Sequence, residues 1–157
     1  MIEIEHKFLL KNDDWKATAS EGIRYQQGYI STTNHTAVRI RIAGDKGYLT
    51  LKGPRGGKKG ISCAEFEYEI PVTDAESIIV ELVDSPVIDK IRYLVTHQGK
   101  TWEVDIFSGD NAGLEVAEIE LNSEYEQFEL PSWVGLCVSE DSRYSNYSLA
   151  QVPFKDW

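Results

Sequence analysis

The chain has 157 residues, enough for one domain with a buried core, and its 41% hydrophobic and 27% charged residues are ordinary for a globular protein. Its net charge of −10 argues against nucleic acid as a partner, because phosphate contacts need a basic surface. No apolar run approaches the ~20 residues of a membrane span, and Cys63 and Cys137 form neither a metal spacing nor a disulfide framework. We therefore expect a single cytoplasmic domain over residues 1–157, without a signal peptide or membrane association, with free thiols, as a monomer or homodimer.

The first ten residues alternate between apolar and charged side chains, which is typical of a β-strand with one apolar and one charged face. The apolar positions are Ile2, Ile4 and Phe8, and the charged positions are Glu3, Glu5 and Lys7. Two carboxylates with a lysine beyond them are an unusual solvated face. They look more like an arrangement for a divalent metal and a phosphate.

The same alternation predicts strands over residues 22–30, 36–43, 48–53 and 62–71, with a hairpin turn at Gly44–Gly47. Residues 53–60 form a loop rich in glycine and lysine. This loop lacks the Gly-Lys-Ser/Thr ending of a P-loop and precedes a strand instead of a helix. We therefore interpret it as a mobile basic hairpin loop.

The second half of the chain contains the clearest helix signal. A capping box, Thr73-x-x-Glu76, precedes apolar residues at helical spacing, namely Ile78, Ile79, Leu82 and Val83. Further strands are predicted over residues 87–97, 101–108 and 115–121. A short helix is expected within 123–130, a loop over 131–135, and a small helix that docks aromatic residues within 141–150.

The charged faces of seven of these strands share one pattern, because charges of like sign recur at i and i+2 and the sign changes from strand to strand. The members are Glu3/Glu5, Arg39/Arg41, Glu67/Glu69, Lys90/Arg92, Glu103/Asp105 and Glu118/Glu120, with Lys52 alone on its strand. Each pair taken singly is typical of a solvated sheet face. Like charges on one strand repel, however, and ordinary surface decoration would mix the signs. The sorting by strand favours a functional face.

A closed antiparallel barrel of about eight strands accounts for this pattern, because closure turns one face of every strand toward a common interior. Basic side chains there would bind consecutive phosphates of one ligand. Acidic side chains would bind Mg²⁺ or Mn²⁺ through oxygen ligands. An interior that binds phosphates and metal together suits phosphoryl transfer.

Glu3-x-Glu5-x-Lys7 resembles the ExExK signature of the CYTH superfamily, the triphosphate tunnel metalloenzymes. Elements that match this family follow in the same order along nearly the whole chain: Arg39-x-Arg41, Lys52, Glu67-x-Glu69, Lys90-x-Arg92, Asp105, Glu118-x-Glu120 and Arg143-Tyr144-x-Asn146. The resemblance implies a mainly β fold, an eight-stranded antiparallel barrel with a few helices packed outside, whose tunnel binds a triphosphate.

The resemblance also implies roles for individual residues. It implies that Glu3, Glu5 and Glu120 are metal ligands, with Glu118 beside them as a fourth member of the metal-binding set. It implies a phosphate clamp of Lys7, Arg39, Arg41, Lys52, Lys90, Arg92 and Arg143. Glu67, Glu69 and Asp105 would line the tunnel. The catalytic set comprises Glu3, Glu5, Glu118 and the seven basic residues of the clamp.

Three positions depart from the pattern of the family. His6 stands where relatives often carry a basic residue, Ser62-Cys63 replaces Ser-Arg, and Arg143-Tyr144-x-Asn146 lacks the flanking lysines. The basic residues of the clamp itself are all present.

The resemblance therefore implies a metal-dependent enzyme that hydrolyses the terminal phosphoanhydride of a small-molecule triphosphate. Inorganic triphosphate is the first candidate, and nucleoside triphosphates are others. A class IV-type adenylate cyclase, a thiamine triphosphatase and a non-catalytic polyphosphate or nucleotide sensor are the alternatives.

Overall fold

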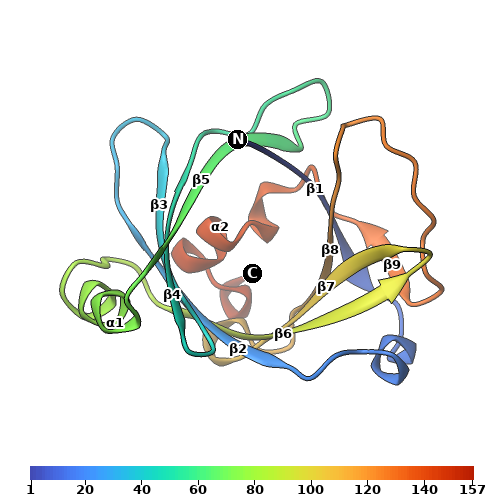
Figure 1. Ribbon diagram of the computed structural model, residues 1–157, viewed down its shortest axis with the longest axis horizontal. Helices are drawn as coiled ribbons and strands as arrows, with labels where there is room; N and C mark the ends of the chain where they lie inside the picture. Colours follow the sequence, from blue (N-terminus) through green and yellow to red (C-terminus); the bar gives the residue numbers. More distant parts are fainter.

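The alternating segments form β-strands that close into an antiparallel barrel in the computed structural model, which describes all residues 1–157 (Figure 1). The strands are β1 (Ile2–Leu10), β2 (Ile23–Ile30), β3 (Ala37–Ala43), β4 (Lys46–Lys52), β5 (Ser62–Ile70), β6 (Ile88–His97), β7 (Lys100–Phe107), β8 (Glu115–Glu120) and β9 (Val134–Cys137). The helices are α1 (Val72–Glu81) and α2 (Asn146–Gln151), with short 3-10 turns at Asp14–Ala17, Gly109–Asn111, Ser142–Tyr144 and Phe154–Asp156. Neither helix is long and apolar enough to cross a membrane.

The strand order is β5-β4-β3-β2-β6-β7-β8-β1-β9, and the pairing of β5 with β1 closes the ring. Strand β1 makes this closure because its two halves pair with different neighbours. Ile2–Ile4 pair with β5, whereas Glu5–Leu9 pair with β8. Strand β9 pairs with the end of β1, where Phe8 lies opposite Cys137. The predicted eight-stranded barrel is confirmed, with β9 as an additional short strand.

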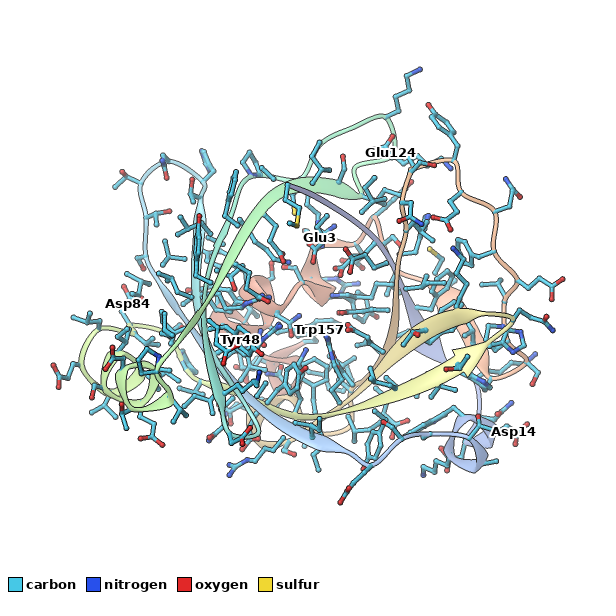
Figure 2. All side chains as sticks on the ribbon, viewed as in Figure 1. Glu3, Asp14, Tyr48, Asp84, Glu124 and Trp157 are labelled. Carbon is cyan, nitrogen blue, oxygen red and sulfur yellow. The ribbon has the colours of Figure 1, made fainter.

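Side chains of opposite parity face opposite sides of the barrel wall, so the sequence alternation separates a charged interior from an apolar exterior. Outside, Phe8, Trp102 and Ile119 pack with Trp15 and Trp133 of the flanking segments in the larger buried apolar cluster. Inside, charged side chains fill the middle of the lumen. Figure 2 shows Glu3 projecting into this interior.

One end of the lumen is filled by an apolar plug. Leu149 and Ala150 of α2 are buried against Ile88, Phe107 and Val116, which face the lumen on β6, β7 and β8. Figure 1 shows α2 within the outline of the ring, whereas α1 lies outside it. Helix α1 thus packs outside the barrel, as predicted, whereas the apolar residues of α2 are buried where the lumen face itself becomes apolar.

The structure differs from three local predictions. Helix α1 begins after Pro71 without a side-chain cap, so Thr73 lies inside the helix and forms no capping box. Residues 123–130 contain no helix. Residues 134 and 135, predicted as the end of a loop, belong to β9. The predicted small helix near the end of the chain is present as α2, where the Ser145 hydroxyl accepts a hydrogen bond from the Ser148 amide.

Candidate active site

A continuous network of buried charges occupies the part of the lumen next to the apolar plug. Lys90 and Asp105 are completely buried and lie 2.5 Å apart (Nζ to Oδ2). Arg92 binds Asp105 through two nitrogens, each at 2.7 Å, and also contacts Glu103. Glu118 then links Arg92 at 3.0 Å to Lys7 at 2.9 Å. The strands β1, β6, β7 and β8 thus share one ionic network.

The pKa values within this network follow from burial and opposite charge. Burial alone raises the pKa of Glu118, but Lys7, Arg92 and Lys90 outweigh it and bring the pKa well below its usual value. For the same reason the pKa of Asp105 is lowered by Arg92 and Lys90. Burial lowers the pKa of Lys90 to about 8 despite Asp105. Glu118 and Asp105 therefore remain ionised and hold the cations in fixed positions.

A second group of charges lies at the seam where β1 meets β5. The Lys52 ammonium contacts Glu3 and Glu65, both at 2.7 Å. Burial and Arg39 lower the pKa of Lys52, but the carboxylates of Glu3, Glu5 and Glu65 reverse this and raise it above its ordinary value. The Cys63 thiol donates a hydrogen bond to Glu3 at 3.4 Å, and burial, followed by the charge of Glu3, raises the pKa of Cys63 to about 11. Cys63 is therefore a neutral thiol beside Glu3.

A third group lies on β2 to β5. The Arg39 guanidinium donates to Glu67 at 3.0 Å and to the Thr50 hydroxyl at 3.1 Å. Arg41 donates to the amide oxygen of Gln27 at 3.0 Å. Arg41 is the only one of the seven predicted phosphate-binding residues without a carboxylate partner in the structure. Burial and the neighbouring cations Arg39 and Arg92 lower the pKa of Arg41 to about 10. Arg41 is thus a cation that an anionic ligand would stabilise.

Carboxylates converge on the edge between β1 and β8, where the metal ligands were predicted. Glu3 and Glu5 share the lumen face of β1, and Glu5 lies directly opposite Glu120 on β8. Burial and the charges of Glu3, Glu65 and Glu5 raise the pKa of Glu120. Carboxylate oxygens held close enough to repel one another are a suitable donor set for a hard divalent cation. No three of these side chains are arranged around one point. Glu3 is ion-paired to Lys52, and Glu5 is ion-paired to Arg55.

A cavity of about 460 Å³ opens beside these carboxylates. Its walls come from β1, from the ends of β3 and β4, from the loop over residues 53–60 and from the segment that precedes α2. The basic side chains on its walls are Lys7, Arg39, Lys52, Arg55 and Lys59, and the acidic ones are Glu5, Glu140 and Asp141. A site of this size and charge can bind a small polyanion.

Of the predicted site residues, Glu5, Lys7, Arg39 and Lys52 line this cavity, and two lie outside the charge networks altogether. The Arg143 side chain is 62% exposed, pairs with Asp141 at 2.7 Å and lies over the Trp157 ring at 4.8 Å. Glu69 is exposed and pairs with Lys46 at 3.4 Å at the far end of β4. The structure brings the other predicted residues to the lumen face, but it leaves these two outside the networks described above.

Several residues that the structure places in the site have no role predicted from the sequence. Glu65 shares Lys52 with Glu3, and Glu103 contacts Arg92. Arg55 binds Glu5 at 2.7 Å from the loop over residues 53–60. The sequence could have indicated Glu65, because it lies two residues from Glu67 and so shares its face of β5. No periodic signal exists for Arg55, because it lies outside any strand.

Comparison with known proteins gives a consistent result. The CYTH domain family model matches residues 1–151. An inorganic triphosphatase of Acetivibrio thermocellus is 47% identical over 155 residues, which cover 99% of this chain and 97% of the relative. An inorganic triphosphatase of Nitrosomonas europaea is 34% identical over 158 residues, with coverage of 96% and 97%.

A solved structure supports the same relationship. The crystal structure of an inorganic triphosphatase superposes on this chain with a TM-score of 0.68 at 32% identity and covers 94% of this chain and 93% of its own. The family match spans the barrel from β1 to α2, including every strand that contributes to the charged lumen. This chain belongs to the CYTH domain family.

Proposed function

We propose that this protein is a metal-dependent inorganic triphosphatase. The observation that carries the proposal is the charge of the cavity. The protein has a net charge of −10, yet the cavity walls carry five basic residues beside the carboxylates of β1, namely Lys7, Arg39, Lys52, Arg55 and Lys59. A surplus of cations at a cavity in an otherwise acidic protein favours a small polyanion. The similarity to relatives that are named inorganic triphosphatases supports triphosphate as that polyanion.

The basic residues of the lumen would bind and orient the substrate. Lys7 and Arg39 are buried and held by Glu118 and Glu67, so they are preorganised toward the cavity. Such fixed cations stabilise charge on a transferring phosphoryl group without reorganising during the reaction. Arg41, which has no carboxylate partner and donates to Gln27, would pair with a phosphate group of the substrate. We assign Lys90 and Arg92 to the positioning of this clamp through Asp105 and Glu118.

The acidic residues at the edge between β1 and β8 would hold the metal. Glu3, Glu5 and Glu120 are the ligands that we propose for Mg²⁺ or Mn²⁺, and Glu118 is a residue beside them that holds Lys7 and Arg92. When bound, the divalent cation supplies positive charge and Lewis acidity at the phosphate oxygens. A carboxylate of this set would orient a water for in-line attack on the terminal phosphorus. The bond to the bridging oxygen breaks, and phosphate and pyrophosphate leave.

A phosphate-release screen tests this function. Triphosphate, ATP and thiamine triphosphate are each offered to the protein with Mg²⁺ and with Mn²⁺. We expect phosphate and pyrophosphate from triphosphate, and slower release from the two larger substrates. Cyclic AMP and pyrophosphate formed from ATP would instead identify a cyclase. Tight triphosphate binding without release of phosphate would identify a sensor.

The substitution Glu3→Gln tests the proposed metal set. It removes one carboxylate while preserving side-chain shape, and we expect turnover of triphosphate to fall by at least about a hundredfold. Glu76→Gln, on the exposed side of α1, is the matched control and should retain full activity. Thermal melts of both variants distinguish a lost ligand from a lost fold. Full metal-dependent turnover by Glu3→Gln would contradict the assignment.

A further inference from the structure

The loop over residues 53–60 places one arginine on a predicted metal ligand. Arg55 donates from Nη2 to Glu5 Oε1 at 2.7 Å and from Nη1 to the carbonyl oxygen of Ile61 at 3.1 Å. Its side chain is 35% exposed and lines the cavity, whereas that of Glu5 is 13% exposed. Arg55 is therefore ion-paired with a carboxylate that, under the proposed function, binds the metal.

We propose that Arg55 is a substrate-binding residue controlled by the metal, which exchanges Glu5 for a phosphate group when the divalent cation binds. The inference rests on the proposed function and deepens it. Without metal, Arg55 neutralises Glu5. With metal, Arg55 leaves that carboxylate and contacts the polyphosphate, so that the cation and the substrate are bound together.

The exchange follows from competition between two cations for one carboxylate. A divalent ion bound to Glu5 repels the Arg55 guanidinium over the few ångströms that separate them in a partly buried site. Once released, Arg55 is a cavity-lining cation without a counter-ion. Planar guanidinium groups bind phosphate through paired hydrogen bonds, so an anionic phosphate in the same cavity is the partner that it would gain.

The side chain of Arg55 is freer to change partners than that of Lys52. Lys52 is the last residue of β4 and is bound to both Glu3 and Glu65. Arg55 lies three residues further along, in a loop whose backbone is held at Gly56 by a bridge to Ser62, but its side chain is 35% exposed and bound to a single carboxylate. The side chain of Arg55 can therefore change partners without a shift of β4.

The remainder of the loop is anchored over the cavity by Glu124. The Glu124 carboxylate accepts hydrogen bonds from the Ser62 hydroxyl at 3.1 Å and from the Lys58 amide at 3.2 Å. The Lys59 ammonium donates to the Glu124 carbonyl oxygen at 2.9 Å. Figure 2 shows Glu124 on the segment that faces this loop across the top of the barrel. This anchor keeps Arg55 within reach of both Glu5 and the cavity.

The test compares Arg55→Met with Lys58→Met. Both remove one positive charge from the same loop, but no ion pair involves the Lys58 side chain. Mn²⁺ binding is measured without substrate, from the electron paramagnetic resonance signal of free Mn²⁺. The KM and kcat for triphosphate are then measured at saturating Mn²⁺.

We expect Arg55→Met to bind Mn²⁺ about threefold to tenfold more tightly than the wild type, because a competing cation is gone. The KM for triphosphate should rise about tenfold, because a charged hydrogen bond to phosphate is lost. Arg55→Lys should restore the wild-type Mn²⁺ affinity. It should reverse only part of the increase in KM, since lysine presents a single point charge. Lys58→Met should change each quantity less than about twofold.

The exchange predicts that Arg55→Met tightens Mn²⁺ binding and at the same time raises the KM for triphosphate. If Arg55 only supports the loop, Arg55→Met will weaken Mn²⁺ and triphosphate binding together, and the inference is overturned. Equal effects of Arg55→Met and Lys58→Met would overturn it as well. Failure of the wild type to hydrolyse triphosphate would refute the proposed function alone, because the Mn²⁺ titration contains no substrate.

Discussion

At the scale of single residues, the buried carboxylates act mainly as holders of cations. Glu118 is 5% exposed and bridges Lys7 on β1 to Arg92 on β6. An ion pair removed from water contributes little by itself, but loss of one partner leaves an uncompensated buried charge. Glu118 should therefore be essential for stability as well as for the arrangement of the clamp.

We predict that Glu118→Gln lowers the free energy of unfolding by about 3 kcal/mol at pH 7, because it leaves Lys7 and Arg92 without this counter-ion. The folded-state pKa of Glu118 lies below its unfolded value. Its stabilisation is therefore fully present above the unfolded pKa and is lost as pH falls through the folded pKa. The difference between wild type and variant should shrink on acidification below about pH 4.

Urea denaturation at a series of pH values measures this difference. Asp110→Asn is the control, since Asp110 forms an exposed pair with Lys155 and its loss should change stability by less than about 1 kcal/mol. A Glu118→Gln protein as stable as the wild type at pH 7 would contradict the structural role of the carboxylate.

The residues of the lumen could be predicted from the sequence where they obey the alternation of a strand. Lys90 and Arg92 are two apart on β6, so both face the interior. Arg55 could not be predicted, because it reaches Glu5 from a loop that carries no period. Arg143 was assigned by resemblance to a motif near the end of the chain, but in this structure Asp141 holds it outside the cavity.

At the scale of secondary-structure elements, α1 is held against the barrel by small residues. Ala75 is completely buried at the contact with β3 and β4. A Cβ added at Gly47 of β4 would lie 2.9 Å from the Ala75 Cβ and 3.0 Å from the carbonyl oxygen of Ile70. The close approach of this helix to the sheet therefore requires glycine at residue 47.

We predict that Gly47→Ala destabilises the protein by about 1–3 kcal/mol, because backbone atoms of the Pro71 connection cannot yield as a side chain does. Gly56→Ala is the control, since the space around Gly56 is open, and it should change stability by less than about 0.5 kcal/mol. Thermal or urea denaturation measures both variants. Equal stability of the two variants would show that α1 can move away from β4 at no cost.

The elements themselves differ in how well the sequence predicts them. Long alternating strands such as β6, with ten residues, carry a strong period, and their paths were predicted within a few residues. Strand β9 has only four residues, and they contain Gly135, so its pairing with β1 is a tertiary effect that no local pattern reveals. Helix α1 was predicted from its apolar spacing, although Pro71 and not Thr73 precedes its first turn.

At the scale of the whole molecule, the proposed metal would join strands that backbone pairing already brings together. Glu3 and Glu5 lie on β1 and Glu120 lies on β8, next to the three-residue seam with β5. A ligand that binds only the folded state stabilises it according to its concentration relative to Kd. Metal should therefore stabilise the closed barrel as a unit.

We predict that Mn²⁺ at about a hundredfold excess over its Kd raises the Tm of the wild type by roughly 5–10 °C over the value in EDTA. In Glu120→Gln this increment should shrink, because a proposed ligand is gone. The Tm of the same variant in EDTA should equal or exceed that of the wild type, because repulsion with Glu3, Glu5 and Glu65 is relieved. Differential scanning calorimetry provides both values, and a lower Tm of the variant in EDTA would contradict the proposed crowding of carboxylates.

The position of β1 in the ring also bears on the kinetics of folding. Hairpins such as β3–β4 and β6–β7 form between neighbours in the chain, whereas Glu5 must meet Glu120 and Ile2 must meet Ala64. Contacts between residues far apart in sequence form slowly, because the loop they close must first be ordered. Within the barrel β1 precedes the other strands in the chain, yet two of its three pairing partners, β8 and β9, are the last strands. The acidic edge between β1 and β8 should therefore form late in folding, when the barrel closes.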